Sequence, residues 1–151
     1  MRVLRAMPAD KAKEKLHANV KTAQELAWTF VLERYLGRKV WNDDFAQGMA
    51  AGMAKSQPPK PPESFNEILT QLEKSNAEWR ALIESTSEEQ LRENVHFMAG
   101  PKKMGEITRM DWAWFLLHDE IHHRGQFSIL LRLAGAKVPS VYGPSESEPW
   151  I

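Results

Sequence analysis

The 151-residue chain contains no cysteine. This absence excludes disulfide bonds, thiolate metal sites and a cysteine nucleophile, and it fits a reducing compartment. No apolar run approaches the roughly 20 residues of a membrane-spanning helix, and the N-terminus lacks the apolar core of a secretory signal. We therefore expect a cytoplasmic protein without a membrane partner.

The chain also has no excess of charge of either sign. Twenty basic and twenty acidic residues give a formal net charge of zero, so no overall field attracts nucleic acid, and we expect no nucleic-acid partner. A chain of this length buries about one core. We expect residues 1–151 to form a single domain.

Three capping signals, each followed by an apolar stripe at helical spacing, predict three long helices. The signals begin at Thr22, Ser64 and Thr108. The predicted helices span about 22–36, 64–84 and 110–134, with boundaries good to about two to four residues. The fold class that we expect is all-α.

The other segments are predicted to be shorter or irregular. Residues 1–6 predict a short N-terminal helix. Gly37 is expected to end the first long helix and Gly135 the last. Residues 85–109 predict a loop with some local structure, and residues 138–145, rich in proline and turn formers, predict an extended tail.

The helix predicted over 110–134 carries polar residues on its apolar stripe. Read at steps of four and three, the stripe is Trp112, Leu116, Asp119, His123, Gln126, Leu130 and Leu133. Three polar side chains on a buried stripe need partners, water or a metal, because burying a polar group without a hydrogen-bond partner costs several kcal/mol. We therefore expect the functional site at the centre of this helix, and we expect Arg132 to be exposed.

Two pairs of side chains four residues apart can hold one ion on this helix. Asp119 with His123 is preferred because it lies on the leucine stripe, and His118 with His122 is the alternative. Nitrogen and oxygen donors suit zinc, nickel, iron or manganese. The residues alone also fit a simpler interpretation, in which these side chains only hydrogen-bond one another.

The motif HHRGQ over residues 122–126, with the sequence that follows it to residue 145, resembles the DinB/YfiT-like superfamily of metal-dependent four-helix bundles. Residues 25–28, ELAW, resemble the start of the second helix of that family. The resemblance covers most of the chain. It implies a divalent metal held by one histidine of the second helix and two histidines four apart on the helix with HHRGQ.

Two of the three ligands implied by the resemblance differ in this chain. His123 matches the histidine before the arginine of the motif, whereas Asp119 stands where the family has its partner histidine. Thr29 occupies the position expected for the histidine of the second helix. Glu33, one turn further, can supply a replacement carboxylate, so the implied metal ligands are Asp119, His123 and Glu33, a set that suits a harder ion.

Other polar residues of this region are expected to support the ligands or to contact substrate, and they are Thr29, Arg124, Gln126 and His122. Relatives have a full first helix, whereas this chain begins near where that helix should end. The expected fold is thus a DinB-like four-helix bundle with a shortened N-terminal helix. Either the bundle lacks one wall, or a neighbouring subunit or a longer natural start supplies it, and a homodimer is expected.

The resemblance implies a metal-dependent enzyme, a hydrolase or thiol-dependent transferase that acts on a small molecule. An ion with an open coordination position would lower the pKa of a bound water or thiol and so generate a nucleophile. The alternative is a non-catalytic DinB-like bundle with a degenerate site, acting as a dimeric stress-related or binding protein. Analogy of fold does not decide between them.

Overall fold

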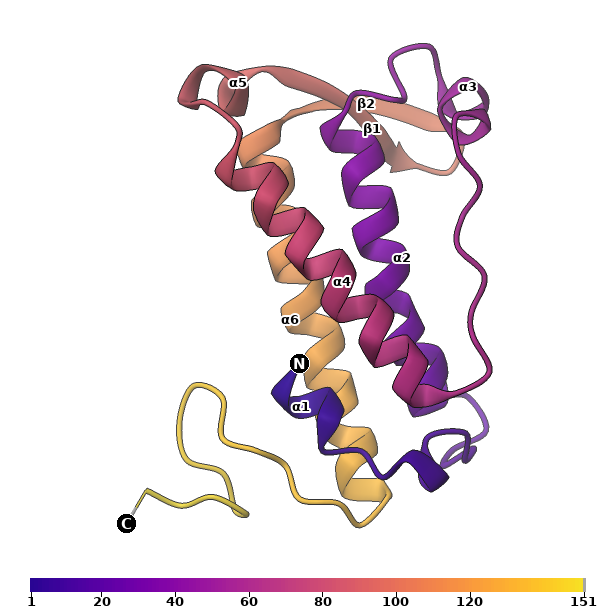
Figure 1. The fold of residues 1–151 in the computed structure, drawn as a ribbon, viewed down its shortest axis with the longest axis vertical. Helices are drawn as coiled ribbons and strands as arrows, with labels where there is room; N and C mark the ends of the chain where they lie inside the picture. The colour runs from indigo at the N-terminus through magenta and orange to yellow at the C-terminus, as the bar shows by residue number, and fades with distance from the viewer. Residues whose placement is uncertain (151) are drawn as a thin grey trace. The chain divides into compact units, whose positions relative to one another are not determined.

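The computed structural model describes residues 1–150 and is mostly helical, with one two-stranded sheet (Figure 1). In chain order the elements are α1 Arg2–Arg5, the 3-10 helix η1 Ala9–Lys11, α2 Ala23–Trp41, α3 Met49–Ala54, α4 Phe65–Glu84, α5 Glu88–Arg92, β1 Asn94–Gly100, β2 Lys103–Thr108 and α6 Arg109–Leu133. Within these described residues, no helix is both long and apolar enough to cross a membrane.

The three long helices begin where the capping signals predict. At the start of α2 the Thr22 hydroxyl accepts the backbone N–H of Glu25, and the Glu25 carboxylate accepts the N–H of Thr22 at 2.7 Å. Ser64 and Glu67 form the same reciprocal pair before α4. The Thr108 hydroxyl accepts the N–H of residue 111 at the start of α6. These local bonds satisfy backbone donors that a helix start leaves without partners.

The prediction that Gly37 ends the first long helix is wrong, because α2 continues to Trp41. Gly37 is buried inside the helix, and a Cβ built on it would lie 2.8 Å from Cδ1 of Leu116 on α6. A residue without a side chain therefore allows α6 to approach α2 closely at this point.

Residues 94–108 form an antiparallel hairpin, so the expectations of a loop here and of an all-α chain need correction. The strands pair from Asn94 with Thr108 to Met98 with Met104, and the side chain of Val95 is buried. A two-stranded hairpin has little stability in water. Its formation depends on a core against which it packs, and a sequence pattern does not reveal that core.

Contacts divide the chain into two units, which are described separately. Unit 1 comprises Met1–Val31, Pro61–Glu73 and the residues from Glu120 onward. In this unit α1 packs with parts of α2, α4 and α6 around a core that includes Val3, Leu4, Leu26, Phe30, Ile68, Leu72, Phe127, Leu130 and Leu131. The short α1 agrees with the short helix predicted over residues 1–6.

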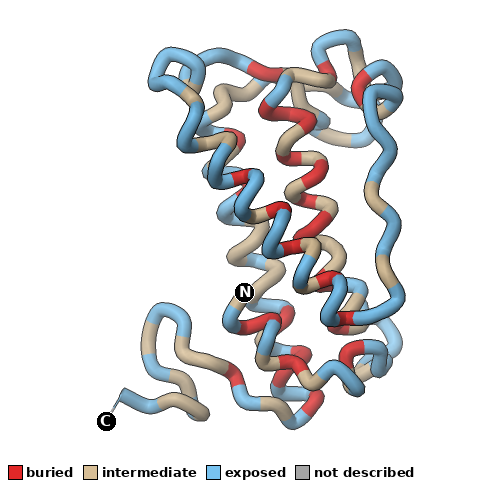
Figure 2. The backbone as a smooth tube through the Cα atoms, viewed as in Figure 1, coloured by how far each residue is buried: buried red, intermediate tan, exposed pale blue. Residues whose placement is uncertain are grey.

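Unit 2 comprises Leu32–Lys60 and Lys74–Asp119. Its core contains Val40, Trp41, Phe45, Trp79, Val95, Trp112 and Leu116. The hairpin lies across the C-terminal end of α2 and the N-terminal end of α6 (Figure 1). The proline-rich connection from α3 to α4 has only exposed and partly exposed residues (Figure 2).

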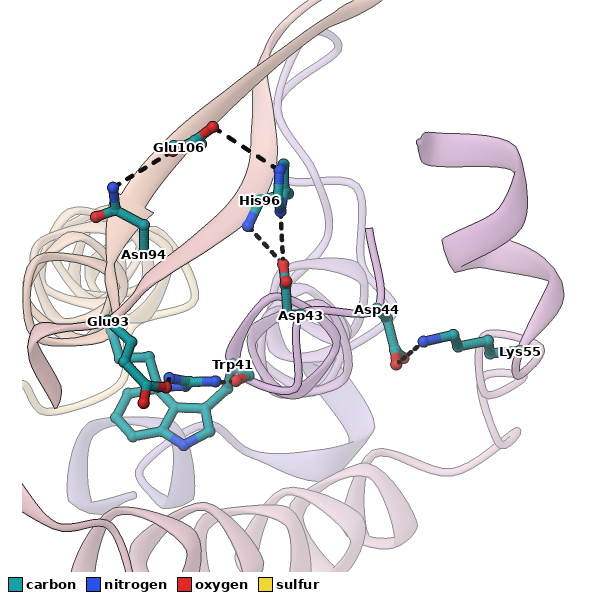
Figure 3. A network of polar contacts seen from close by, with 9 residues as sticks. Trp41, Asp43, Asp44, Lys55, Glu93, Asn94, His96 and Glu106 are labelled. Carbon is teal, nitrogen blue, oxygen red and sulfur yellow. Dashed lines mark hydrogen bonds and ion pairs between the residues drawn. The ribbon is translucent and has the colours of Figure 1, made fainter. Parts of the chain in front are cut away.

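Polar contacts attach the hairpin to the end of α2 (Figure 3). The Asp43 carboxylate accepts a hydrogen bond of 2.8 Å from the backbone N–H of His96 and lies 2.9 Å from Nδ1 of the same residue. Arg109 donates to the main-chain oxygen of Trp41 at 2.8 Å and contacts the Glu93 carboxylate at 2.6 Å. These bonds connect residues far apart in the sequence and hold the hairpin in place.

The predicted apolar stripe of α6 is correct for Trp112, Leu116 and Leu130, which are buried, and Arg132 is exposed as expected. It is wrong for Leu133, which is 55% exposed, and for Gln126, which is also exposed. A straight α-helix drifts by about 20° per heptad from a strict repeat of 3.5 residues per turn. Over the three heptads from residue 112 to residue 133 this drift turns the last leucine away from the core.

Candidate metal centre

Helix α2 buries a carboxylate. Glu33 is 7% exposed and lies between the buried residues Val31 and Tyr35. Charged side chains are rarely buried to this extent unless they are paired or bind a metal. Glu33 is therefore a candidate ligand or ion-pair partner on a helix whose other buried side chains are mainly apolar.

Helix α6 places Asp119 and His123 one turn apart on one face of an unbroken helix. Both residues are partly buried. One ligand atom each from Glu33, Asp119 and His123 can be chosen so that all three lie within 4.8 Å of one another. These are the three residues that the resemblance implied as metal ligands.

The chemistry of this donor set fits a divalent ion. Two carboxylates and one imidazole are ligands that zinc, iron, nickel and manganese accept. Metal–ligand bonds of about 2.0–2.2 Å in a tetrahedral site place donor atoms roughly 3.4 Å apart, so the three side chains would move closer together to hold one ion. Acidic groups also cluster on protein surfaces without an ion, but Glu33 is buried.

Thr29 occupies the position at which the resemblance implied a histidine, and its hydroxyl has other partners. It donates to the main-chain oxygen of Glu25 at 3.2 Å and accepts a hydrogen bond of 2.8 Å from Nζ of Lys21. Its contact with Lys21 connects α2 to the segment that precedes it.

The alternative pair of histidines on α6 lies at the surface. His118 and His122 are both exposed, and Nε2 of His122 lies 2.9 Å from Nε2 of Gln126. The guanidinium of Arg124 stacks over the ring of Tyr142 in the C-terminal tail, 4.6 Å from the ring centroid. The supporting or substrate roles of His122, Arg124 and Gln126 stay predictions.

A pocket of about 460 Å³ opens beside His123 in unit 1. It is lined by Asn19, Val20, Lys21, Leu26, His123, Gln126, Ile129, Leu130 and Leu133. The sequence pattern indicated His123 and Gln126 but not the wall formed by residues 19–21. The sequence shows only that these residues precede a helix cap. It does not show that they form a pocket wall, because tertiary packing decides which helix such a segment approaches.

Comparison with known proteins assigns the chain to a family. The DinB family model matches residues 1–150. Over 74 residues the chain is 35% identical to the uncharacterized protein YrdA of Bacillus subtilis (strain 168), and this match covers 49% of the chain but only 41% of YrdA. The crystal structure of the DinB-like protein YjoA from Bacillus subtilis is similar with a TM-score of 0.67 and 19% identity, covering 92% of this chain and 87% of YjoA. That level of identity shows the fold alone, whereas the family match extends over nearly the whole sequence: the chain belongs to the DinB family.

Proposed function

We propose that this DinB-family protein is a metal-dependent enzyme that acts on a small molecule. The observation that carries the proposal is the grouping of the buried Glu33 carboxylate with Asp119 and His123. Three protein ligands are the usual number in catalytic metal sites, which keep further positions for water and substrate. A bound divalent ion would supply Lewis-acid chemistry or a nucleophile by lowering the pKa of a bound water or thiol.

The residues around this cluster can bind and orient a substrate. His123 and Gln126 both line the pocket, so a molecule held there lies beside a proposed ligand and a side-chain amide. The amide can donate and accept hydrogen bonds and can thus fix the orientation of a polar group. This arrangement suits hydrolysis or thiol transfer, the two reaction classes implied by the family resemblance.

The experiment is a calorimetric titration of tag-free, chelator-treated protein with zinc, manganese and nickel. We expect His123→Ala and Glu33→Gln to weaken binding by roughly tenfold or more, because even outer partners of metal ligands contribute about 10–100-fold to affinity. His118→Ala is the matched control, since it removes an exposed histidine of the same helix and should leave the affinity unchanged.

Two results would contradict the assignment. Loss of binding only in His118→Ala and His122→Ala would place the ion on the exposed pair. Absence of binding in the wild type would favour the alternative, a DinB-like bundle with a degenerate site and a binding or stress-related role. The protein must carry no affinity tag, because a tag can itself bind metal.

Catalysis is tested on the metal-loaded protein. Hydrolysis of a nitrophenyl ester, and attack of a cysteine thiolate on a chloronitrobenzene with release of chloride, distinguish the two reaction classes. We expect one of these rates to follow the metal content and to fall in His123→Ala. A homodimer is also proposed, and sedimentation equilibrium of the tag-free protein measures it directly.

A further inference from the structure

The pocket beside His123 has a wall of exposed apolar side chains. Val20 is 40% exposed, Ile129 57% and Leu133 55%, and all three line this one concavity. Single exposed apolar residues are normal on a protein surface, whereas several gathered in one hollow mark a binding site. A ligand with an apolar body would cover all three side chains and remove them from water.

The charge at this pocket comes from Lys21. It is the one lysine or arginine among the residues 1–150 that line the pocket, and no aspartate or glutamate of that range lines it. The Lys21 ammonium donates to the Thr29 hydroxyl at 2.8 Å, which uses one of its three N–H donors. The carboxylate of Glu25, which does not line the pocket, also interacts electrostatically with Lys21, and the other N–H donors of the ammonium can bind an anion in the pocket. The amides of Asn19 and Gln126 supply further polar contacts.

We propose that this pocket binds a small amphiphilic carboxylate, with its apolar body against Val20, Ile129 and Leu133 and its carboxylate facing Lys21. The inference rests on the proposed function in that it names the substrate class of that site. The binding itself depends only on residues of unit 1.

Size and charge together favour this class over others. The volume of about 460 Å³ lies in the lower part of the range of small-molecule sites, about 300–1,000 Å³. An inorganic anion would use Lys21 but leave the apolar wall in water. A neutral apolar molecule would cover the wall but would bring no anion into the pocket beside the ammonium, and an amphiphilic amine would place two cations together.

The test is calorimetric titration of chelator-treated wild-type protein with octanoate, octanol, octylamine and phosphate. We expect octanoate to bind most tightly. Lys21→Met should weaken octanoate binding roughly tenfold or more, because hydrogen bonds to charged groups are the stronger ones, and should leave octanol binding unchanged. Ile129→Ser, at an exposed helix position, should weaken both. Lys74→Met removes an exposed lysine that does not line the pocket and should change neither.

The inference is overturned if octanoate and octylamine bind equally, if phosphate binds as tightly as octanoate, or if Lys21→Met leaves octanoate binding intact. Absence of octanoate binding at millimolar concentration overturns it as well. Failure of the metal titration is a separate result. Protein that binds octanoate but no metal would reject the proposed enzyme and support this pocket, whereas protein that binds metal but no octanoate would do the reverse.

Discussion

Trp112 and Gly37 are joined by a buried hydrogen bond of 3.1 Å from the indole Nε1 to the main-chain oxygen. At the same place Cδ1 of Leu116 fills the space that a side chain on residue 37 would need. The missing Cβ lets Leu116 approach the backbone of α2 closely, and the indole of Trp112, one turn earlier on α6, binds that backbone at the same residue. This contact is central to the core of unit 2.

Truncation of Leu116 should therefore be costly. Leu116 is 3% exposed, and we expect Leu116→Ala to lower the free energy of unfolding by roughly 2–5 kcal/mol through lost burial and a cavity. Leu117→Ala is the matched control, because Leu117 is exposed on the same helix and should change stability by less than about 0.5 kcal/mol. Urea denaturation measures both. Equal midpoints for the two variants would show that the stripe of α6 is assigned wrongly.

Two glycine substitutions should shift stability in opposite directions. A Cβ at Gly52 would lie 2.3 Å from Cδ1 of the buried Phe45 and 3.0 Å from the main-chain oxygen of Asp44, so Gly52→Ala should destabilise by about 1–3 kcal/mol. Gly125 lies within α6 with nothing inside 4 Å of its Cβ position. Gly125→Ala should stabilise by up to about 1 kcal/mol through helix propensity. Thermal melts that shift the same way would contradict this contrast.

Asp43 should make stability depend on acidic pH. Burial raises the pKa of this carboxyl, but the hydrogen bonds from the backbone and ring of His96 outweigh burial, so the pKa lies below its usual value. A lowered pKa in the folded state stabilises the protein above the unfolded pKa, about 3.9, and this contribution is lost as the pH falls through the folded pKa.

The comparison is the free energy of unfolding of wild type and Asp43→Asn across this range. Residue 43 has a φ of 54°, and asparagine tolerates this left-handed conformation as aspartate does. We expect the wild type to be more stable above about pH 5 and the difference to shrink below about pH 4. A difference that grows as the pH falls would show that Asp43 does not act through its ionised form.

Metal binding should also appear as a gain in stability. An ion that binds the folded protein alone, at a hundred times its dissociation constant, stabilises by about 2.7 kcal/mol. We expect manganese or zinc to raise the melting temperature of the wild type and chelator to reverse the shift, while Glu33→Gln responds weakly. Differential scanning calorimetry measures this. An equal rise in Glu33→Gln would place the ion elsewhere.

Local signals allowed the long helices to be predicted. Caps such as Thr22 with Glu25 act over three residues, and the apolar stripes repeat within one or two turns, so neither depends on the rest of the fold. The same holds for Asp119 and His123, whose spacing of one turn puts them on one face of any continuous helix. The role of Glu33 as a metal ligand was implied only through the family resemblance, because nothing in the spacing of α6 indicates which residue of another helix lies near it.

Other features were decided by contacts between residues distant in the sequence. Glycine is a residue type that often ends helices, but Gly37 lies inside α2, where Leu116 of α6 packs against it. The hairpin forms where Asp43 binds His96, and Lys21 reaches the pocket because the segment before α2 lies against α6. A helix cap depends only on residues that are neighbours along the chain. A pocket wall depends on residues that folding brings together, and a short stretch of sequence does not determine the free energy of that packing.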